Sequence, residues 1–553
     1  MGKLKGKMLF AKGNRACIRR NYAKMVSFYQ KAILEGNGEA AYFLAKSYLE
    51  GKYIPKDLQL ALSCFQKAID LGYAPAMIDL GKMYMNGENV DRNFALATAL
   101  FLKAEEHGSV FAQPLLEECE EKVSANVSAQ MTVPSQHRDA EHRYEKGCAY
   151  LELGNYAEAF PIFAQLAEEG DGNGYQGLGR CYYHGYGVNK DIRQAAFYFT
   201  EGARLGSPAA QYSLGVCYTK GEGLSQDDMT AVKWYEKAAE QGYMPSQYNL
   251  AYCYFHGRGV EKNVEKAALW YQKAAEQGHA KAQTSLGYCY EAGQGVPQNH
   301  SKAAEWYQKA AEQGDATAEC RFGYCYETGQ GVPQSHSKAV EWYQKAAKRG
   351  NANAQCNLGY CYEIGQGVPQ SHSKAVEWYQ KAAEQGYARA QNNLGICYTD
   401  GEGVAKDFTK AAELYQKAAE QGFTAAIYNL GTSYYYGRGV AIDYAKSAEL
   451  YKKAAEQGHA DAQNNLGRSY YCGQGVPQNY TMAFCWFSKA AVQGNATAQA
   501  NLGICYEYGH GVPQDYQKAL EWYQKAMSQG NETAAKRCEE LRKQGIIYNP
   551  FSH

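Results

Sequence analysis

The sequence predicts an all-α solenoid, a stack of helix–turn–helix repeats. Three observations support this class: a glycine recurs every 36 residues, a residue type that favours helix starts recurs in the same register, and all tryptophans share one repeat position. A fixed period of this length is typical of arrays in which each repeat contacts mainly its neighbours. We therefore expect the 553 residues to form repeat arrays rather than three or four globular domains.

The recurring glycine fixes the register of the array. It occupies Gly170, Gly206, Gly242, Gly278, Gly314, Gly350, Gly386, Gly422, Gly458, Gly494 and Gly530. Gly36, Gly72 and Gly108 keep the same spacing earlier in the chain. The step of 62 residues from Gly108 to Gly170 breaks the phase, so the sequence predicts a short N-terminal array and a long C-terminal one.

The repeat from 315 to 350 shows how each unit is expected to fold. Ala318, Phe322 and Tyr326 lie at helical spacing and define the apolar face of a first helix. Gly329 can end that helix because glycine takes a positive φ without strain. Pro333 follows, where it cannot extend the helix.

A second helix is expected to start at the next favoured N-cap residue. The ten residues at that position are Asp191, Asp227, Asn263, Asn299, Ser335, Ser371, Asp407, Asp443, Asn479 and Asp515. Each has a side-chain oxygen that can accept a hydrogen bond from the first turn of a helix. Gly323 lies inside the first helix, where it costs about 1 kcal/mol relative to alanine. Its recurrence indicates that the two helices of a repeat approach closely.

The tryptophans and most cysteines are predicted to be core residues. The tryptophans are Trp234, Trp270, Trp306, Trp342, Trp378, Trp486 and Trp522, and Leu414 and Leu450 fill the remaining places nearby. Eight cysteines share another position: Cys181, Cys217, Cys253, Cys289, Cys325, Cys361, Cys397 and Cys505. Packed helices lie about 8–10 Å apart, which is too far for disulfides between equivalent cysteines, so we expect small buried thiols.

The repeat resembles the Sel-1-like repeat, a relative of the tetratricopeptide repeat. The resemblance rests on Ala-x-x-x-Leu-Gly-x-x-Tyr-x-x-Gly-x-Gly-Val at 282–296 and on Lys-Ala-x-x-Trp-Tyr-x-Lys-Ala-Ala-x-x-Gly at 302–314. It implies a right-handed α/α superhelical solenoid. It also implies that the first helices line a concave face and that the family's usual role is to bind proteins.

The resemblance and the phase break together predict five segments. These are 1–122, a helical segment with two degenerate repeats; 123–136, a linker or loop; 137–170, a tetratricopeptide-like repeat; 171–530, ten Sel-1-like repeats; and 531–553, a C-terminal capping helix and tail.

Charge and composition exclude several classes of function. Lys+Arg and Asp+Glu number 57 each, so no basic excess indicates a nucleic-acid partner. No apolar run is long enough for a membrane span, and the N-terminal apolar stretch is too short for a signal peptide, so we expect a cytoplasmic protein without membrane insertion. No motif indicates a cofactor, a metal or a catalytic constellation. The glycine pairs, such as Gly293 and Gly295, lack the Lys-Ser/Thr of a phosphate loop.

The resemblance implies that the first helices of this chain line a concave face. Two repeat positions of the first helix then lie on that face, one mostly tyrosine in the middle repeats and the other mostly glutamate. The predicted partner-binding residues are Tyr252, Phe255, Tyr288, Glu291, Tyr324, Glu327, Tyr360 and Glu363. Tyrosine suits binding because it offers a large contact area with little rotamer entropy. We expect aromatic or apolar side chains of a protein or peptide partner to stack on the tyrosines and basic ones to approach the glutamates. Near-identity of the middle repeats leaves open that both positions simply reflect duplication.

The predicted function is a non-enzymatic scaffold or adaptor for protein–protein interactions. One alternative is a host-directed bacterial effector that binds in the same way. Another, from the enzyme class, is the β-lactam-directed hydrolysis associated with disulfide-rich bacterial members of the family. The absence of a regular second cysteine position and of a signal peptide argues against that alternative.

Overall fold

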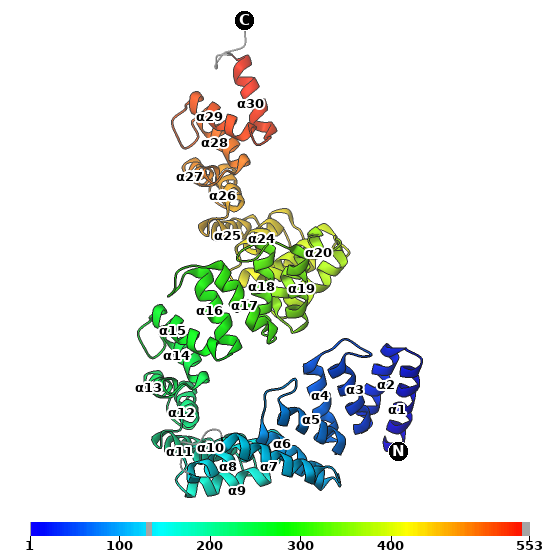
Figure 1. Ribbon diagram of the computed structural model, residues 1–553. Coiled ribbons are helices and arrows are strands. Elements are labelled where there is room, and N and C mark those ends of the chain that lie inside the picture. Colours follow the sequence, from blue (N-terminus) through cyan, green and yellow to red (C-terminus); the bar gives the residue numbers. More distant parts are fainter. Residues whose placement is uncertain (1, 129–134, 545–553) are drawn as a thin grey trace. The chain divides into compact units, whose positions relative to one another are not determined.

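The computed structural model describes residues 2–128 and 135–544, which form 30 helices and no strand (Figure 1). The chain divides into two compact units, Met1–Lys273 and Ala274–His553. Within each unit, consecutive helices pack as pairs, and each pair packs on the next. The predicted all-α solenoid of helix–turn–helix repeats is therefore confirmed.

The helices of the first unit, and the helix that crosses its boundary, have the following bounds: α1 (Gly2–Ile18), α2 (Tyr22–Leu34), α3 (Gly38–Glu50), α4 (Leu58–Asp70), α5 (Ala74–Asn86), α6 (Phe94–Glu106), α7 (Ala112–Ser128), α8 (Ser135–Glu152), α9 (Tyr156–Glu168), α10 (Gly172–His184), α11 (Ile192–Arg204), α12 (Pro208–Lys220), α13 (Asp228–Glu240), α14 (Met244–His256) and α15 (Val264–Glu276).

The second unit contains α16 (Ala280–Ala292), α17 (His300–Glu312), α18 (Ala316–Thr328), α19 (His336–Lys348), α20 (Ala352–Ile364), α21 (His372–Glu384), α22 (Ala388–Asp400), α23 (Phe408–Glu420), α24 (Thr424–Tyr436), α25 (Tyr444–Glu456), α26 (Ala460–Cys472), α27 (Tyr480–Val492), α28 (Ala496–Tyr508), α29 (Tyr516–Met527) and α30 (Glu532–Lys543). From α10 onward the even-numbered helix is the first helix of a repeat and the odd-numbered one is the second.

The predicted start of every second helix is confirmed by its cap. The side chain of Ser335, for example, accepts a hydrogen bond from the backbone N–H of Lys338 in α19. The equivalent bond forms at each of the ten predicted N-cap residues. These caps satisfy backbone donors that the helix itself leaves without partners.

The two glycines of each inter-helix loop have different roles. Gly329 has φ 73° and ends α18, with its N–H donating to the carbonyl of Cys325. Gly331 also has a positive φ, and a Cβ there would lie 2.1 Å from the carbonyl oxygen of His300, at the start of the preceding second helix. The second glycine therefore lets the loop lie directly on the neighbouring repeat.

A glycine inside most first helices makes room for an aromatic ring of the second helix, which is tyrosine in most repeats. A Cβ on Gly323 would lie 2.8 Å from the ring of Tyr343, which is fully buried against it. The same arrangement joins Gly287 to Tyr307 and Gly359 to Tyr379. The close helix approach predicted from this glycine is thus confirmed, and a buried tyrosine ring occupies the space that glycine leaves.

The tryptophans pack between repeats, as predicted. Trp342 of α19 lies against Ala310 and Ala311 of α17, in the preceding repeat, and against Ala318 of α18. It also meets the ring of Phe322, with 5.2 Å between the ring centroids.

The N-terminal repeats connect to the longer array inside the first unit. Helix α8 packs on α6, and Leu153, just after α8, shares a hydrophobic core with Phe101. Lys103 Nζ also donates to the carbonyl of Leu153 at 3.4 Å. Helix α7 continues to Ser128, into the segment 123–136 for which the sequence predicted a linker, and residues 129–134 of that segment lie outside the described residues.

Helix α30 closes the C-terminal end of the array. Ala534, Cys538 and Leu541 are buried and share a core with Tyr523 of α29. The predicted tail beyond residue 544 lies outside the described residues. Across residues 2–128 and 135–544, every helix is too short or too polar to cross a membrane.

All 17 cysteines are free thiols, and those at the repeated position are buried. Burial raises the pKa of Cys289 to about 11 and that of Cys505 to about 12, because the thiolate is poorly solvated inside the array. Cys472 and Cys485 are exposed.

We expect a short iodoacetamide pulse at mildly alkaline pH to modify Cys472 and Cys485 and to leave the buried position unmodified, since the thiolate is the reactive form. Peptide mass spectrometry would locate the label, with protein unfolded in guanidinium chloride as the fully labelled control. Labelling of Cys289 at the rate of Cys472 would contradict the burial described above.

The buried tyrosine hydroxyls provide a stability test. Tyr343 Oη donates to Glu327 Oε2 at 2.5 Å, whereas the Tyr415 hydroxyl, at the same repeat position, lies 3.0 Å from the hydroxyl of Thr399. We expect Tyr343→Phe to cost about 1.5–3 kcal/mol and the matched Tyr415→Phe about 0.5–1.5 kcal/mol, because bonds to charged groups are stronger. Hydrogen exchange of α18–α19 and of α22–α23 would measure the local loss. Equal losses at the two sites would refute the ranking.

Candidate protein-binding surface

The predicted tyrosines lie on the exposed side of the first helices. In the second unit, Tyr288, Tyr324 and Tyr360 occupy the same position of α16, α18 and α20, and their exposed fractions are 37%, 40% and 38%. Each side chain stands beside buried residues of its own helix, such as Gly287 and Cys289 next to Tyr288. In the first unit, Tyr252 on α14 is 41% exposed. We call the three tyrosines of the second unit, Tyr288, Tyr324 and Tyr360, the tyrosine column.

Arg321 of α18 covers part of this column. Its guanidinium lies 5.8 Å from the ring centroid of Tyr288 and 3.5 Å from Glu291 Oε1. At the corresponding position of α20 stands Asn357, whose side-chain oxygen accepts from Arg389 at 3.2 Å. The surface around Tyr288, Tyr324 and Tyr360 therefore combines aromatic rings with hydrogen-bonding and cationic groups.

The predicted glutamates have a structural role that the sequence analysis missed. Each accepts a hydrogen bond from the buried tyrosine 16 residues later, in the second helix of the same repeat. The pairs are Glu291 with Tyr307, at 2.5 Å, Glu327 with Tyr343, at 2.5 Å, and Glu363 with Tyr379. Burial and the hydrogen bond to the carboxyl group raise the pKa of Tyr307 far above its usual value.

Other residues at the glutamate position confirm that structural role. Thr219 and Thr399 place a hydroxyl 3.0 Å from the hydroxyl of Tyr235 and Tyr415, respectively. Phe255 offers no acceptor and instead packs its ring near that of Tyr271, with 6.3 Å between centroids. In these repeats the residue at this position contacts the buried tyrosine. A 16-residue spacing between two helices gives no helical periodicity that would have revealed the contact.

A pocket of about 350 Å³ opens on the same side of the first helices in the first unit. It is lined by Tyr144, Gln176, Arg180, Tyr183, His184, Phe199, Ala209, Tyr212, Ser213, Val216, Cys217 and Tyr243. Arg180 occupies the repeat position of the tyrosine column, and Tyr183 that of the glutamates. No sequence pattern singles out this part of the surface, because its tyrosines come from separate elements: Tyr144 from α8, Tyr183 from α10, Tyr212 from α12 and Tyr243 from the loop before α14.

The chemistry of this Arg180 pocket favours an anionic group. The Arg180 guanidinium contacts Cys148 Sγ at 3.7 Å and forms no ion pair with any residue that the structure describes. Tyr144 donates to Gln176 at 2.7 Å, and Tyr183 donates to Glu222 at 2.6 Å, which holds both rings in place at the pocket. An arginine bordered by tyrosines can bind a carboxylate and stack an attached apolar group.

Comparison with known proteins identifies the repeats. The model of the Sel1 repeat matches residues 38–73, 74–109, 174–207, 208–243, 245–279, 280–315, 316–351, 352–387, 388–423, 424–459, 460–495 and 496–531. A search of curated proteins finds no match.

Two solved structures are similar to this chain. One is c5321, a protective antigen of uropathogenic Escherichia coli strains that displays an SLR fold; it is 30% identical, covers 96% of this chain and 98% of its own, and has a TM-score of 0.57. The other is a Sel1 repeat protein from Oxalobacter formigenes; it is 34% identical, covers 59% of this chain and 93% of its own, and has a TM-score of 0.42.

His184 reports on the charge of the Arg180 pocket. Burial, followed by the positive charges of Arg180 and Lys190, lowers the pKa of His184. We expect Arg180→Met to move that pKa upward, because one charge that opposes protonation is removed. An NMR titration of the His184 ring protons would measure the shift, with Lys237→Met as a control for a remote charge. An unchanged His184 pKa in Arg180→Met would contradict the position of the Arg180 guanidinium close to His184.

Proposed function

The chain belongs to the Sel1 repeat family, and from this premise we propose that it is a non-enzymatic scaffold that binds protein partners through the exposed side of its first helices. Proteins of this family commonly mediate protein–protein interactions. The observation that carries the proposal is the tyrosine column, in which three successive first helices present a tyrosine that is more than a third exposed.

The exposure of these rings favours a binding role. A tyrosine in the same repeat, such as Tyr343, is fully buried and stabilises the core, so the fold has a separate residue for that purpose. The exposed rings offer an apolar surface with a polar tip, at a spacing set by the stacking of repeats. An extended or helical partner segment could contact several of them in turn.

We propose the glutamates as weaker contacts for a partner than the sequence predicts. Glu327 Oε2 is already the acceptor for Tyr343, so a basic side chain of a partner would share the carboxyl group with the core. The tyrosines are therefore proposed as the main contacts, and Glu291, Glu327 and Glu363 as groups that hold the second helix in register.

We propose the cytoplasm as the location, on the basis of the cysteines. A chain with 17 free thiols suits a reducing compartment, where disulfides rarely persist.

Affinity capture from the native lysate would test the scaffold function. We expect the intact chain to retain a specific protein and the Tyr288→Ala/Tyr324→Ala variant to lose it, with at least about a tenfold loss of affinity, since buried interface tyrosines are frequent hot spots.

The matched control is Tyr436→Ala/Tyr508→Ala, which removes two exposed tyrosines from a different repeat position. Circular dichroism would verify that both variants stay helical. Equal capture by the wild type and the Tyr288/Tyr324 variant would move the binding site away from the tyrosine column. Failure of the intact chain to retain any specific protein would argue against a scaffold.

A further inference from the structure

The tryptophan position seals a recess between successive second helices. Where a repeat carries tryptophan, the alanine 31 residues earlier, in the second helix of the preceding repeat, is almost completely buried. Its exposed fraction does not exceed 3% at Ala203, Ala239, Ala275, Ala311, Ala347, Ala455 and Ala491. Trp342, which packs directly on Ala311, shows that the indole supplies this cover.

Two neighbouring repeats lack the indole, and the cover is lost at both. Leu414 and Leu450 stand at the tryptophan position of α23 and α25. The corresponding alanines, Ala383 and Ala419, are half-buried rather than buried. The leucine side chain therefore does not replace the indole in covering the surface beneath it.

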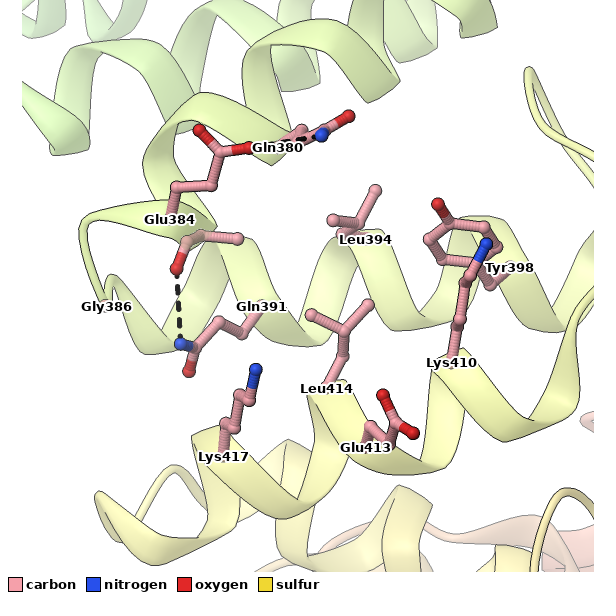
Figure 2. Close-up of a pocket in the computed structure, with 11 residues that line it drawn as sticks. Gln380, Glu384, Gly386, Gln391, Leu394, Tyr398, Lys410, Glu413, Leu414 and Lys417 are labelled. Atoms are coloured by element: carbon pink, nitrogen blue, oxygen red, sulfur yellow. Dashed lines mark hydrogen bonds between the residues drawn. The ribbon is translucent and has the colours of Figure 1, made fainter.

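A cavity of about 440 Å³ lies beside Leu414 (Figure 2). Figure 2 shows its lining side chains coming from three helices: Gln380 and Glu384 from α21, Gln391, Leu394 and Tyr398 from α22, and Lys410, Glu413, Leu414 and Lys417 from α23. Ala383, Leu394 and Tyr398 stand at the repeat positions of Ala311, Phe322 and Tyr326, which lie around Trp342 where it packs on the preceding repeat. The cavity thus occupies the space of a tryptophan side chain.

The second cavity repeats this arrangement one repeat later. It measures about 210 Å³ and lies beside Leu450. Its lining residues are Gln416, Ala419, Glu420, Ile427, Leu430, Lys446, Glu449, Leu450 and Lys453. All nine stand 36 residues after a residue that lines the Leu414 cavity.

A lysine is already placed to bind an aromatic ring in the Leu414 cavity. In all seven tryptophan repeats, the lysine three residues after the tryptophan holds its Nζ over the indole, 3.6–4.4 Å from the ring centroid. Lys417 is the equivalent residue, and it forms no ion pair within the described part of the chain. Lys453, at the second cavity, pairs with Glu449 at 2.8 Å.

We propose that the cavities beside Leu414 and Leu450 form a binding site for tryptophan side chains of a partner protein, with Leu414 as the main position. The indole covers Ala383, packs against Leu394 and Leu414, and lies under the ammonium of Lys417. It restores the contacts that the chain's own tryptophans make in the other repeats. The driving forces are burial of aromatic area and the attraction between a cation and the ring face.

The indole must come from another molecule, because all seven tryptophans of this chain occupy their own repeats. Two equivalent cavities in successive repeats fit a protein segment with two aromatic side chains. The two cavities are one repeat, and so two helices, apart. Packed helices are roughly 10 Å apart and an extended chain advances roughly 3.3 Å per residue, so a spacing of about three to six residues would place one ring in each cavity. This site extends the proposed scaffold function to residues outside the tyrosine column.

Fluorine NMR with N-acetyl-5-fluorotryptophanamide as the probe would test the site directly on the full-length chain. We expect the wild type to broaden the probe signal and N-acetyl-leucinamide to compete poorly. Leu414→Trp/Leu450→Trp should lose at least about tenfold in affinity, because it fills both cavities with a residue that the other repeats already accommodate. No broadening by the wild type, or equal broadening by the filled variant, would overturn the proposal.

Lys417→Ala gives a second test that leaves the apolar lining residues Leu394 and Leu414 in place. Removing one cation–π contact at a partly exposed site should weaken probe binding about two- to fivefold. The matched control is Lys381→Ala, whose lysine lies over Trp378, the indole of its own repeat. Equal probe affinity of Lys417→Ala and the wild type would show that the lysine does not contribute to binding.

A peptide probe separates a protein segment from a small aromatic compound as the occupant. Among acetylated peptides with two tryptophans about three to six residues apart, we expect the best to bind at least about tenfold more tightly than its one-tryptophan counterpart, because the second ring binds within the same molecule. That gain should disappear in Leu450→Trp. No gain from the second tryptophan would overturn the assignment to a protein segment. The outcome is independent of Tyr288 and Tyr324, so failure here leaves the test of the tyrosine column unaffected.

Discussion

The repeat depends on the contact between a tyrosine ring of the second helix and a glycine of the first. At Tyr343 and Gly323 the ring lies where any larger residue would place its Cβ, and the ring itself is fully buried. The glycine costs helix propensity, and close packing of the ring offsets that cost. The hydroxyl then needs a partner inside the protein, which Glu327 supplies. In repeats such as this one, a single contact thus links the residues at three positions.

Variation around this constant contact is where the repeats gain individual properties. The acceptor of the tyrosine hydroxyl is glutamate in some repeats and threonine in others, and either serves the fold. The tryptophan position behaves differently, because leucine fills too little space and leaves a cavity beside Leu414 and Leu450. At Leu414 and Leu450 the repeat pattern changes, apolar burial is lost, and no contact among the described residues compensates. Such a position favours a binding role.

The two surfaces proposed for partners differ in how the fold produces them. The tyrosine column is a regular feature, since each first helix presents the same position to the exterior. The Leu414 cavity is an exception within a regular feature, since it exists only where the repeat pattern is interrupted. A surface that repeats along the array suits a long partner segment but allows it to bind in several registers. A cavity that occurs where the tryptophan is missing binds the partner at one place and so sets the register.

The sequence by itself determined the period, the helix starts and ends, the packing of the tryptophans between repeats and the exposure of Tyr288, Tyr324 and Tyr360. All of these follow from local spacing, because a helix places residues three or four apart on one face and a cap acts within one turn. The tertiary structure alone decided that Glu291, Glu327 and Glu363 serve buried tyrosines, that tyrosines from three helices and one loop gather around Arg180, and that leucine leaves a cavity at Leu414. Those contacts join different helices, 16 to 31 residues or more apart along the chain. Their existence depends on how side chains of different sizes fill the space between helices, which periodicity does not specify.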